Sequence, residues 1–177
     1  MKENKITNKQ LEWFKKYIYI ENIPSLYYLE SLYLGEKKIG ELPKNIFDNL
    51  TNLKSLYLSH NYIMELPNNI FDDLTNLKNL NLGENKISEL PKNIFNKLTN
   101  LEMLFLSNNY ISELPNNILD NLTNLKVLYL RYNYLMELPK NIFDKLTKLE
   151  VLFLDGNDLI CDIQNCRDWG LKKKSCY

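Results

Sequence analysis

Residues 53–76 read LKSLYLSHNYIMELPNNIFDDLTN, and this stretch returns almost unchanged along most of the chain. The leucine that begins it recurs every 24 residues, and one further copy precedes it. The leading leucines are Leu29, Leu53, Leu77, Leu101, Leu125 and Leu149. A fixed period of this length indicates stacked supersecondary units rather than a single globular core. The sequence therefore predicts a solenoid.

Each copy begins with L-x-x-L-x-L and reaches a further apolar anchor five positions later, as at Ile63. The Leu-x-Leu alternation is typical of a strand with one buried face. Because no copy can bury its leucines alone, we expect neighbouring copies to lie strand beside strand in a parallel sheet. The rest of each copy contains a proline and no long helical stripe, which predicts an irregular or 3₁₀ return. Such a return needs more room than the strand spacing of about 4.8 Å, so the stack should curve with its strands on the concave side.

These residues resemble a known family. The pattern L-x-x-L-x-L-x-x-N-x-[IL]-x-x-L-P-x-N-I-F-x-x-L-T-N is similar to the leucine-rich repeat in its typical 24-residue class. Returns such as LPKNIFDNLTN and LPNNIFDDLTN most resemble those of variable lymphocyte receptors and Toll-like receptors. The resemblance implies an α/β repeat solenoid, shaped as a curved horseshoe, that binds ligands, usually proteins, on its concave face.

Three regions are predicted along the chain. They are an N-terminal helical cap with a truncated first turn (1–28), five full repeats with a partial sixth (29–158), and a C-terminal cap and tail (159–177). Thr7 and Gln10 have the spacing of a capping box, so a helix is predicted from Thr7 to about Tyr19. Terminal repeats of a solenoid need caps, so this helix and Trp169 are expected to cover the two apolar ends.

Two sets of side chains are expected inside the stack. The resemblance implies a ladder of asparagines that bonds the backbones of adjacent turns: Asn61, Asn85, Asn109, Asn133 and Asn157. Phenylalanines should stack inside the returns as a second spine: Phe47, Phe71, Phe95 and Phe143. Lys37 replaces the first ladder asparagine and Leu119 interrupts the phenylalanines, so departures from the repeat geometry are expected at these two places.

The positions between the strand leucines, and those just after each strand, should point into the concavity. They vary in size and polarity while the returns barely change, which indicates a scaffold that presents a recognition face. The residues expected to contact a protein ligand are Tyr33, Tyr57, Asn79, Asn81, Met103, Phe105, Val127, Tyr129, Arg131, Tyr132 and Phe153. Rigid aromatic side chains concentrate binding energy. The alternative is that aromatics on neighbouring strands pack together and stiffen the sheet.

The copies also alternate. The first and third share Gly-Glu before the ladder position, Lys-Ile after it and LPKNIF in the return, whereas the second and fourth share Ser and then Asn-Tyr-Ile. This indicates the duplication of a 48-residue unit. Features that repeat at this period can be inherited by copying, so the positions that break it are the better functional candidates.

A row of glutamates precedes the Leu-Pro of the full copies: Glu41, Glu65, Glu89, Glu113 and Glu137. Three lysines lie three residues further on and can neutralise the row: Lys44, Lys92 and Lys140. Exposed ion pairs contribute only about 0–1 kcal/mol, so a solvated flank is the expected role of this row.

Composition narrows the function. The 177 residues fit one domain, and 22 basic with 22 acidic residues give no net charge, which argues against nucleic-acid binding. His60 is the only histidine, and the repeat brings no nucleophile or second metal ligand to it, so no cofactor, metal or catalytic site is predicted. Non-enzymatic protein recognition is the predicted function. The alternatives are a structural or self-assembling repeat protein and, last, a thiol-dependent enzyme that uses a tail cysteine.

The three cysteines, Cys161, Cys166 and Cys176, lie in the tail and cannot all pair internally. One disulfide with a free thiol is one alternative, but three reduced thiols fit an intracellular protein better. The polar N-terminus lacks the apolar core of a secretory signal, and no apolar run approaches the length of a membrane span. We therefore expect an intracellular monomer, or an extracellular protein if a signal has been removed.

Overall fold

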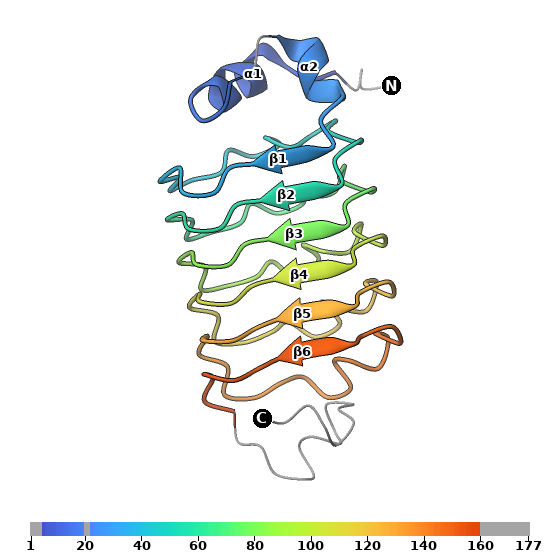
Figure 1. Ribbon diagram of the computed structural model, residues 1–177. Helices are drawn as coiled ribbons and strands as arrows, with labels where there is room; N and C mark the ends of the chain where they lie inside the picture. Colours follow the sequence, from blue (N-terminus) through green and yellow to red (C-terminus); the bar gives the residue numbers. More distant parts are fainter. Residues whose placement is uncertain (1–4, 20–21, 160–177) are drawn as a thin grey trace.

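The computed structural model describes residues 5–19 and 22–159. Helices α1 (Asn8–Lys15) and α2 (Ile23–Tyr27) come first and are followed by six short strands. The strands are β1 (Ser31–Tyr33), β2 (Ser55–Tyr57), β3 (Asn79–Asn81), β4 (Met103–Phe105), β5 (Val127–Tyr129) and β6 (Val151–Phe153). They form one parallel sheet in chain order, with the helices at the β1 end (Figure 1).

The register of the sheet follows the period of the sequence. Leu56 pairs with Leu80, and Leu80 pairs with Leu104, so every strand meets the residue 24 positions further along. Since side chains alternate between the faces of a strand, a slip of one residue would move every strand leucine into solvent. The hydrophobic pattern thus holds the register, and the predicted solenoid with a parallel sheet on one side is confirmed.

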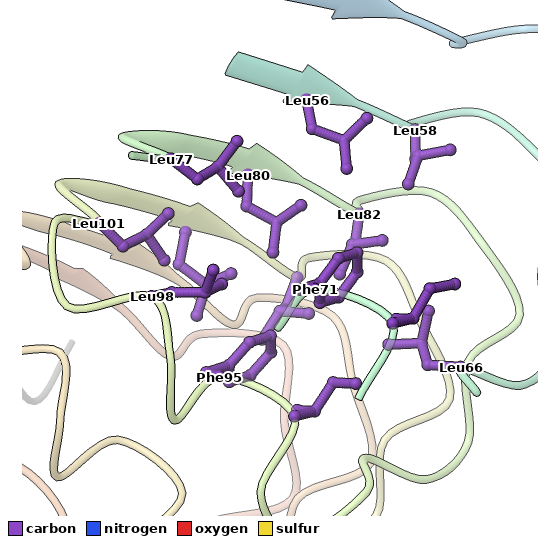
Figure 2. Packing of buried hydrophobic residues seen from close by; sticks show 14 of the residues in the cluster. Leu56, Leu58, Leu66, Phe71, Leu77, Leu80, Leu82, Phe95, Leu98 and Leu101 are labelled. Atoms are coloured by element: carbon purple, nitrogen blue, oxygen red, sulfur yellow. The ribbon is translucent and has the colours of Figure 1, made fainter. Parts of the chain in front are cut away.

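The core runs along the whole stack between the sheet and the returns. Strand leucines such as Leu56 and Leu80 enter it from one side, and Phe71 and Phe95 enter it from the returns (Figure 2). The rings of Phe47 and Phe71 stack with their centroids 6.1 Å apart. The phenylalanine spine is therefore confirmed, and Leu119 takes the phenylalanine position of its copy as an equally buried side chain.

The returns are chains of tight turns rather than continuous helix. In the second copy the Ile70 amide donates to Pro67, the Asp72 amide to Asn69 and the Leu74 amide to Phe71, each spanning three residues. Asn69 has a φ of 62°, in the left-handed region that asparagine tolerates better than most residues, and this interrupts any regular 3₁₀ helix. The irregular return expected from the sequence is confirmed.

The asparagine ladder is present. The side-chain oxygen of Asn109 accepts from the Ile87 amide at 3.0 Å, while its nitrogen donates to the carbonyls of Leu82 and Leu106 at 3.0 and 3.1 Å. The first turn, which has Lys37 in place of asparagine, still receives this support because Asn61 of the next turn accepts from the Lys37 amide. The expected departure is nevertheless present: this amide bond has no counterpart in the later turns that the structure describes. Lys38 also has a φ of 58°, whereas the equivalent residues of the later repeats have no positive φ.

A second asparagine row, which the sequence analysis did not single out, ties the returns together. Asn76 donates to the carbonyl of Thr51, and Asn100 donates to that of Thr75, both at 2.9 Å. The same bond recurs from Asn124 to Thr99. The Leu-Thr-Asn that ends the first four copies was the signal for this row. Asn76 and Asn100 are exposed and Asn124 is half-buried, unlike the first four ladder asparagines, so these bonds compete with water.

Helix α1 covers the first repeat. Its capping box is confirmed: the Thr7 side chain accepts from the Gln10 amide, and the Gln10 side chain accepts from the Thr7 amide. The Phe14 ring lies 6.3 Å from that of Phe47 and extends the spine into the cap. The predicted end near Tyr19 is wrong, since α1 stops at Lys15. The aromatic and β-branched residues that follow are weak helix formers, and so short a helix depends on its packing.

Trp169 and the three cysteines lie outside the described residues, so the predicted C-terminal cap and the thiol state stay predictions.

Candidate functional site

The outward positions of the six strands form one surface, here called the sheet face. In each of β3, β4 and β5 the middle leucine is fully buried and the two flanking side chains are half-buried. This alternation places nine of the predicted contact residues on the sheet face: Tyr33, Tyr57, Asn79, Asn81, Met103, Phe105, Val127, Tyr129 and Phe153. Arg131 and Tyr132 follow β5 directly.

The N-terminal half of the sheet face carries a tyrosine pair and a polar break. The rings of Tyr33 and Tyr57 stack with centroids 4.8 Å apart and planes at 3°, and Tyr33 remains 64% exposed. Next to them, Asn79 donates to the Ser55 hydroxyl, and Asn81 accepts from the Gly83 amide. Both asparagines therefore bond within the chain, although the side-chain oxygen of Asn79 is buried without a hydrogen-bond partner among the described residues.

The C-terminal half carries three aromatic rings in line, here called the aromatic row. The centroids of Phe105 and Tyr129 are 5.0 Å apart, and those of Tyr129 and Phe153 are 4.8 Å apart. Their planes are tilted by 37° and 48°, arrangements that aromatic pairs favour. Met103 and Val127 lie beside the row on the same strands. The rings thus support one another and still expose part of their surface.

Arg131 is engaged at the end of the aromatic row. Its Nε and Nη2 donate to one carboxylate oxygen of Asp155 at 2.8 and 2.6 Å. This bond raises the pKa of Arg131 above its ordinary value. The guanidinium also lies 5.0 Å from the Phe153 centroid and 5.5 Å from that of Tyr132. Arg131 therefore bridges two turns and positions aromatic rings. Arg131 and Asp155 carry opposite charges and stand 24 residues apart, so the repeat period could have predicted their pairing.

Charged side chains that directly precede the strands pair with one another. Lys54 pairs with Glu30 at 2.7 Å, and Glu102 lies 2.7 Å from Lys126 and 3.4 Å from Lys78. Hydrogen bonds from Lys126 and Lys78 lower the pKa of Glu102. This border of the sheet face therefore has no strong electrostatic field of either sign. Apolar contact is the main interaction that the sheet face can make with a partner.

Comparison with known proteins agrees with the repeat geometry. A family model described as leucine rich repeat matches residues 27–87, 75–133 and 106–159. These matches cover well over half of the chain. The chain belongs to the leucine-rich repeat family.

Two solved structures illustrate the likeness of this leucine-rich repeat chain to others. The leucine-rich repeat domain of APL1B is 25% identical with a TM-score of 0.67, over 88% of this chain and 43% of that one. An internalin (InlF) from Listeria monocytogenes is 30% identical with a TM-score of 0.63, over 86% of this chain and 44% of that one. The chain thus spans less than half the length of either. No curated protein matches it.

The leucine-rich repeat chain has a further row of aromatics that the predicted site left out. Tyr62, Tyr110 and Tyr134 stand one position after the ladder asparagines and are 50%, 50% and 54% exposed. Their backbone amides donate to isoleucine carbonyls of the preceding turn, which holds each side chain at the edge of the stack. These tyrosines stand 48 and 24 residues apart, a spacing that was visible in the sequence. They are called the edge tyrosines below.

Among residues 5–19 and 22–159 of this leucine-rich repeat chain, no cluster of His, Cys, Asp and Glu side chains could hold a metal ion. His60 lies at the surface with its Nδ1 2.9 Å from a carboxylate oxygen of Glu84. Within the same residues, no helix is both long and apolar enough to cross a bilayer.

Proposed function

We propose that this chain is a non-enzymatic recognition module that binds a partner protein on its sheet face. Leucine-rich repeat domains typically mediate protein–protein interaction, which supports the general role. The aromatic row carries the more specific proposal, because it gathers Phe105, Tyr129 and Phe153 into one apolar strip of neighbouring strands.

The geometry of the aromatic row suits a binding centre. Each ring packs at a tilt against its neighbour, so little side-chain freedom remains to be lost when a partner binds. Arg131 is held by Asp155 and rests against Phe153, which orders that end of the row before any partner arrives. The stacking that stiffens the sheet therefore also prepares the surface for contact.

The area of the sheet face is adequate for one partner domain. Each of the six strands presents two outward side chains, and the residues just before and after each strand extend this surface toward the 20–30 residues per side of a standard protein interface. In such interfaces a few central aromatic and arginine side chains dominate the binding energy. We place that centre at Met103, Phe105, Val127 and Tyr129, with the N-terminal tyrosine pair at the periphery.

Two alanine variants and one control test the proposal. Bait protein retrieves partners from an extract of the source cells, and calorimetry then measures the affinity of the purified partner. Phe105→Ala or Tyr129→Ala should each weaken binding by more than about 2 kcal/mol, with a melting temperature close to wild type. Glu89→Ala, on the exposed flank, should change neither quantity. Loss of binding in the flank variant alone would place the site elsewhere.

A further inference from the structure

The fifth repeat departs from its odd-numbered relatives along one edge. Where the first and third copies have Gly-Glu before the ladder position and Lys after it, the fifth has Arg131, Tyr132 and Tyr134. Its return keeps the LPKNIF of those copies. Duplication of the 48-residue unit explains the return but not these three residues, so the change is specific to the edge that follows β5.

The replaced residues help to enclose a groove. Tyr110, Tyr132 and Tyr134 line a hollow of about 420 Å³, together with Asn108 and Gly156. The rings of Tyr110 and Tyr134 have centroids 5.9 Å apart. Gly156 has a φ of 72°, and a Cβ at that position would lie 2.3 Å from the Tyr132 ring. Glycine is therefore what allows Tyr132 to lie across the last turn. This hollow is called the tyrosine groove.

The edge tyrosine Tyr62 shows that such a ring can bind a cation. The Lys86 ammonium lies 5.1 Å from the centroid of Tyr62, where it is attracted by the negative face of the ring. One repeat beyond Tyr110 the chain has Tyr134 instead of lysine, and one repeat beyond Tyr134 it has Asp158. Across the described ranges, no cation of the chain covers the ring of Tyr110 or Tyr134.

Among the residues described, no charged side chain lines the tyrosine groove, so nothing in its lining repels a cation. Arg131 is the nearest positive group in sequence, and its charge is offset by Asp155 at 2.6 Å. Glu113 and Glu137 follow Tyr110 and Tyr134 by three residues and are exposed. In the part of the chain that the structure describes, neither glutamate forms an ion pair. The neutralisation expected from the neighbouring lysines is therefore not seen there.

We propose that the tyrosine groove binds a lysine or arginine side chain that a partner protein presents. The cation lies against Tyr110 and Tyr134, as Lys86 lies against Tyr62 two repeats before Tyr110. The site lies beside the sheet face and does not require the aromatic row, so it can be tested alone.

Short blocked peptides test the groove. Acetyl-Gly-Lys-Gly-amide is titrated into ¹⁵N-labelled protein, and amide shifts are followed by NMR. We expect saturable shifts within residues 108–112 and 132–136. Acetyl-Gly-norleucine-Gly-amide, which keeps the alkyl chain but has no charge, should bind at least fivefold more weakly. Equal affinity of the two peptides, or no saturable shift with the lysine peptide, would overturn the proposal.

Matched variants locate the binding to the rings. Tyr110→Leu and Tyr134→Leu retain apolar bulk but remove the aromatic face, and each should weaken lysine-peptide binding at least threefold. Tyr62→Leu, whose ring already holds Lys86, and Phe105→Ala, in the aromatic row, should leave it unchanged. If the groove variants bind like wild type, or if Phe105→Ala abolishes binding, the cation site is not in the groove.

Discussion

Two asparagines, Asn109 and Asn100, show how burial decides what a side chain contributes to stability. Asn109 is only 2% exposed, and its amide satisfies backbone groups of two adjacent turns. Asn100 also bonds to the preceding turn, through the Thr75 carbonyl, but it does so at the surface. Removing a buried side chain leaves its backbone partners without any hydrogen bond, because water cannot reach them. An exposed carbonyl that loses its partner bonds to water instead.

Asn109→Ala should therefore lower the free energy of unfolding by about 3 kcal/mol, because it leaves the buried Ile87 amide without an acceptor. Asn100→Ala, the control at the end of the preceding repeat, should lose only about 0.5–1.5 kcal/mol. Urea unfolding followed by circular dichroism gives both values. Equal losses in the two variants would mean that the ladder asparagine has no special weight.

Helix α1 illustrates how an element that is weak alone becomes stable by docking. Eight residues are too few for a stable isolated helix in water. Two contacts attach it to the first return. The side-chain nitrogen Nε2 of Gln10 donates to the carbonyls of Ile46 and Asp48 at 3.1 and 2.9 Å, and Phe14 packs on Phe47. Phe14 is fully buried, so the helix closes the apolar end of the spine.

Phe14→Ala should cost about 3–5 kcal/mol, as expected for removing a buried aromatic side chain. Lys15→Ala, one residue further along the same helix, removes only an exposed pair with Glu12 and should cost less than about 1 kcal/mol. Thermal unfolding by calorimetry compares the two. A melting temperature for Phe14→Ala that matches the lysine control would show that α1 is not a cap.

The whole molecule has no centre, because each turn packs only on the turns before and after it (Figure 1). Stability in such a stack is close to a sum of turn and interface contributions, so damage at one end need not reach the other. This arrangement also explains why a binding surface can change over a few turns while the remaining turns keep their structure.

Hydrogen exchange in Phe14→Ala should reveal this one-dimensional behaviour. The amides of Leu34 and Glu36, which donate across the first two turns, should lose protection. Those of Leu130 and Tyr132, which donate across the last two, should exchange as in wild type. Uniform acceleration at all four amides would instead indicate that the chain unfolds as a single cooperative unit.

The sequence by itself determined the repeat, the register and most of the interior. The period of 24 residues places Leu56, Leu80 and Leu104 in line, and burial of one strand face then allows a single register. The phenylalanine spine followed from the same period, and the family resemblance implied the role of the ladder asparagines. Local signals were enough to start helix α1 at Thr7, but its end at Lys15 depended on packing against the first repeat.

Only the tertiary structure decided how the outward side chains share their contacts. The sequence placed Arg131 on the recognition face, but the pairing with Asp155 and the two ring contacts depend on distances across neighbouring turns. The same holds for the tyrosine groove, which requires Gly156 of one turn beneath Tyr132 of another. Burial restricts most inward positions to apolar residues. Outward positions acquire their role from neighbours that lie a full repeat away.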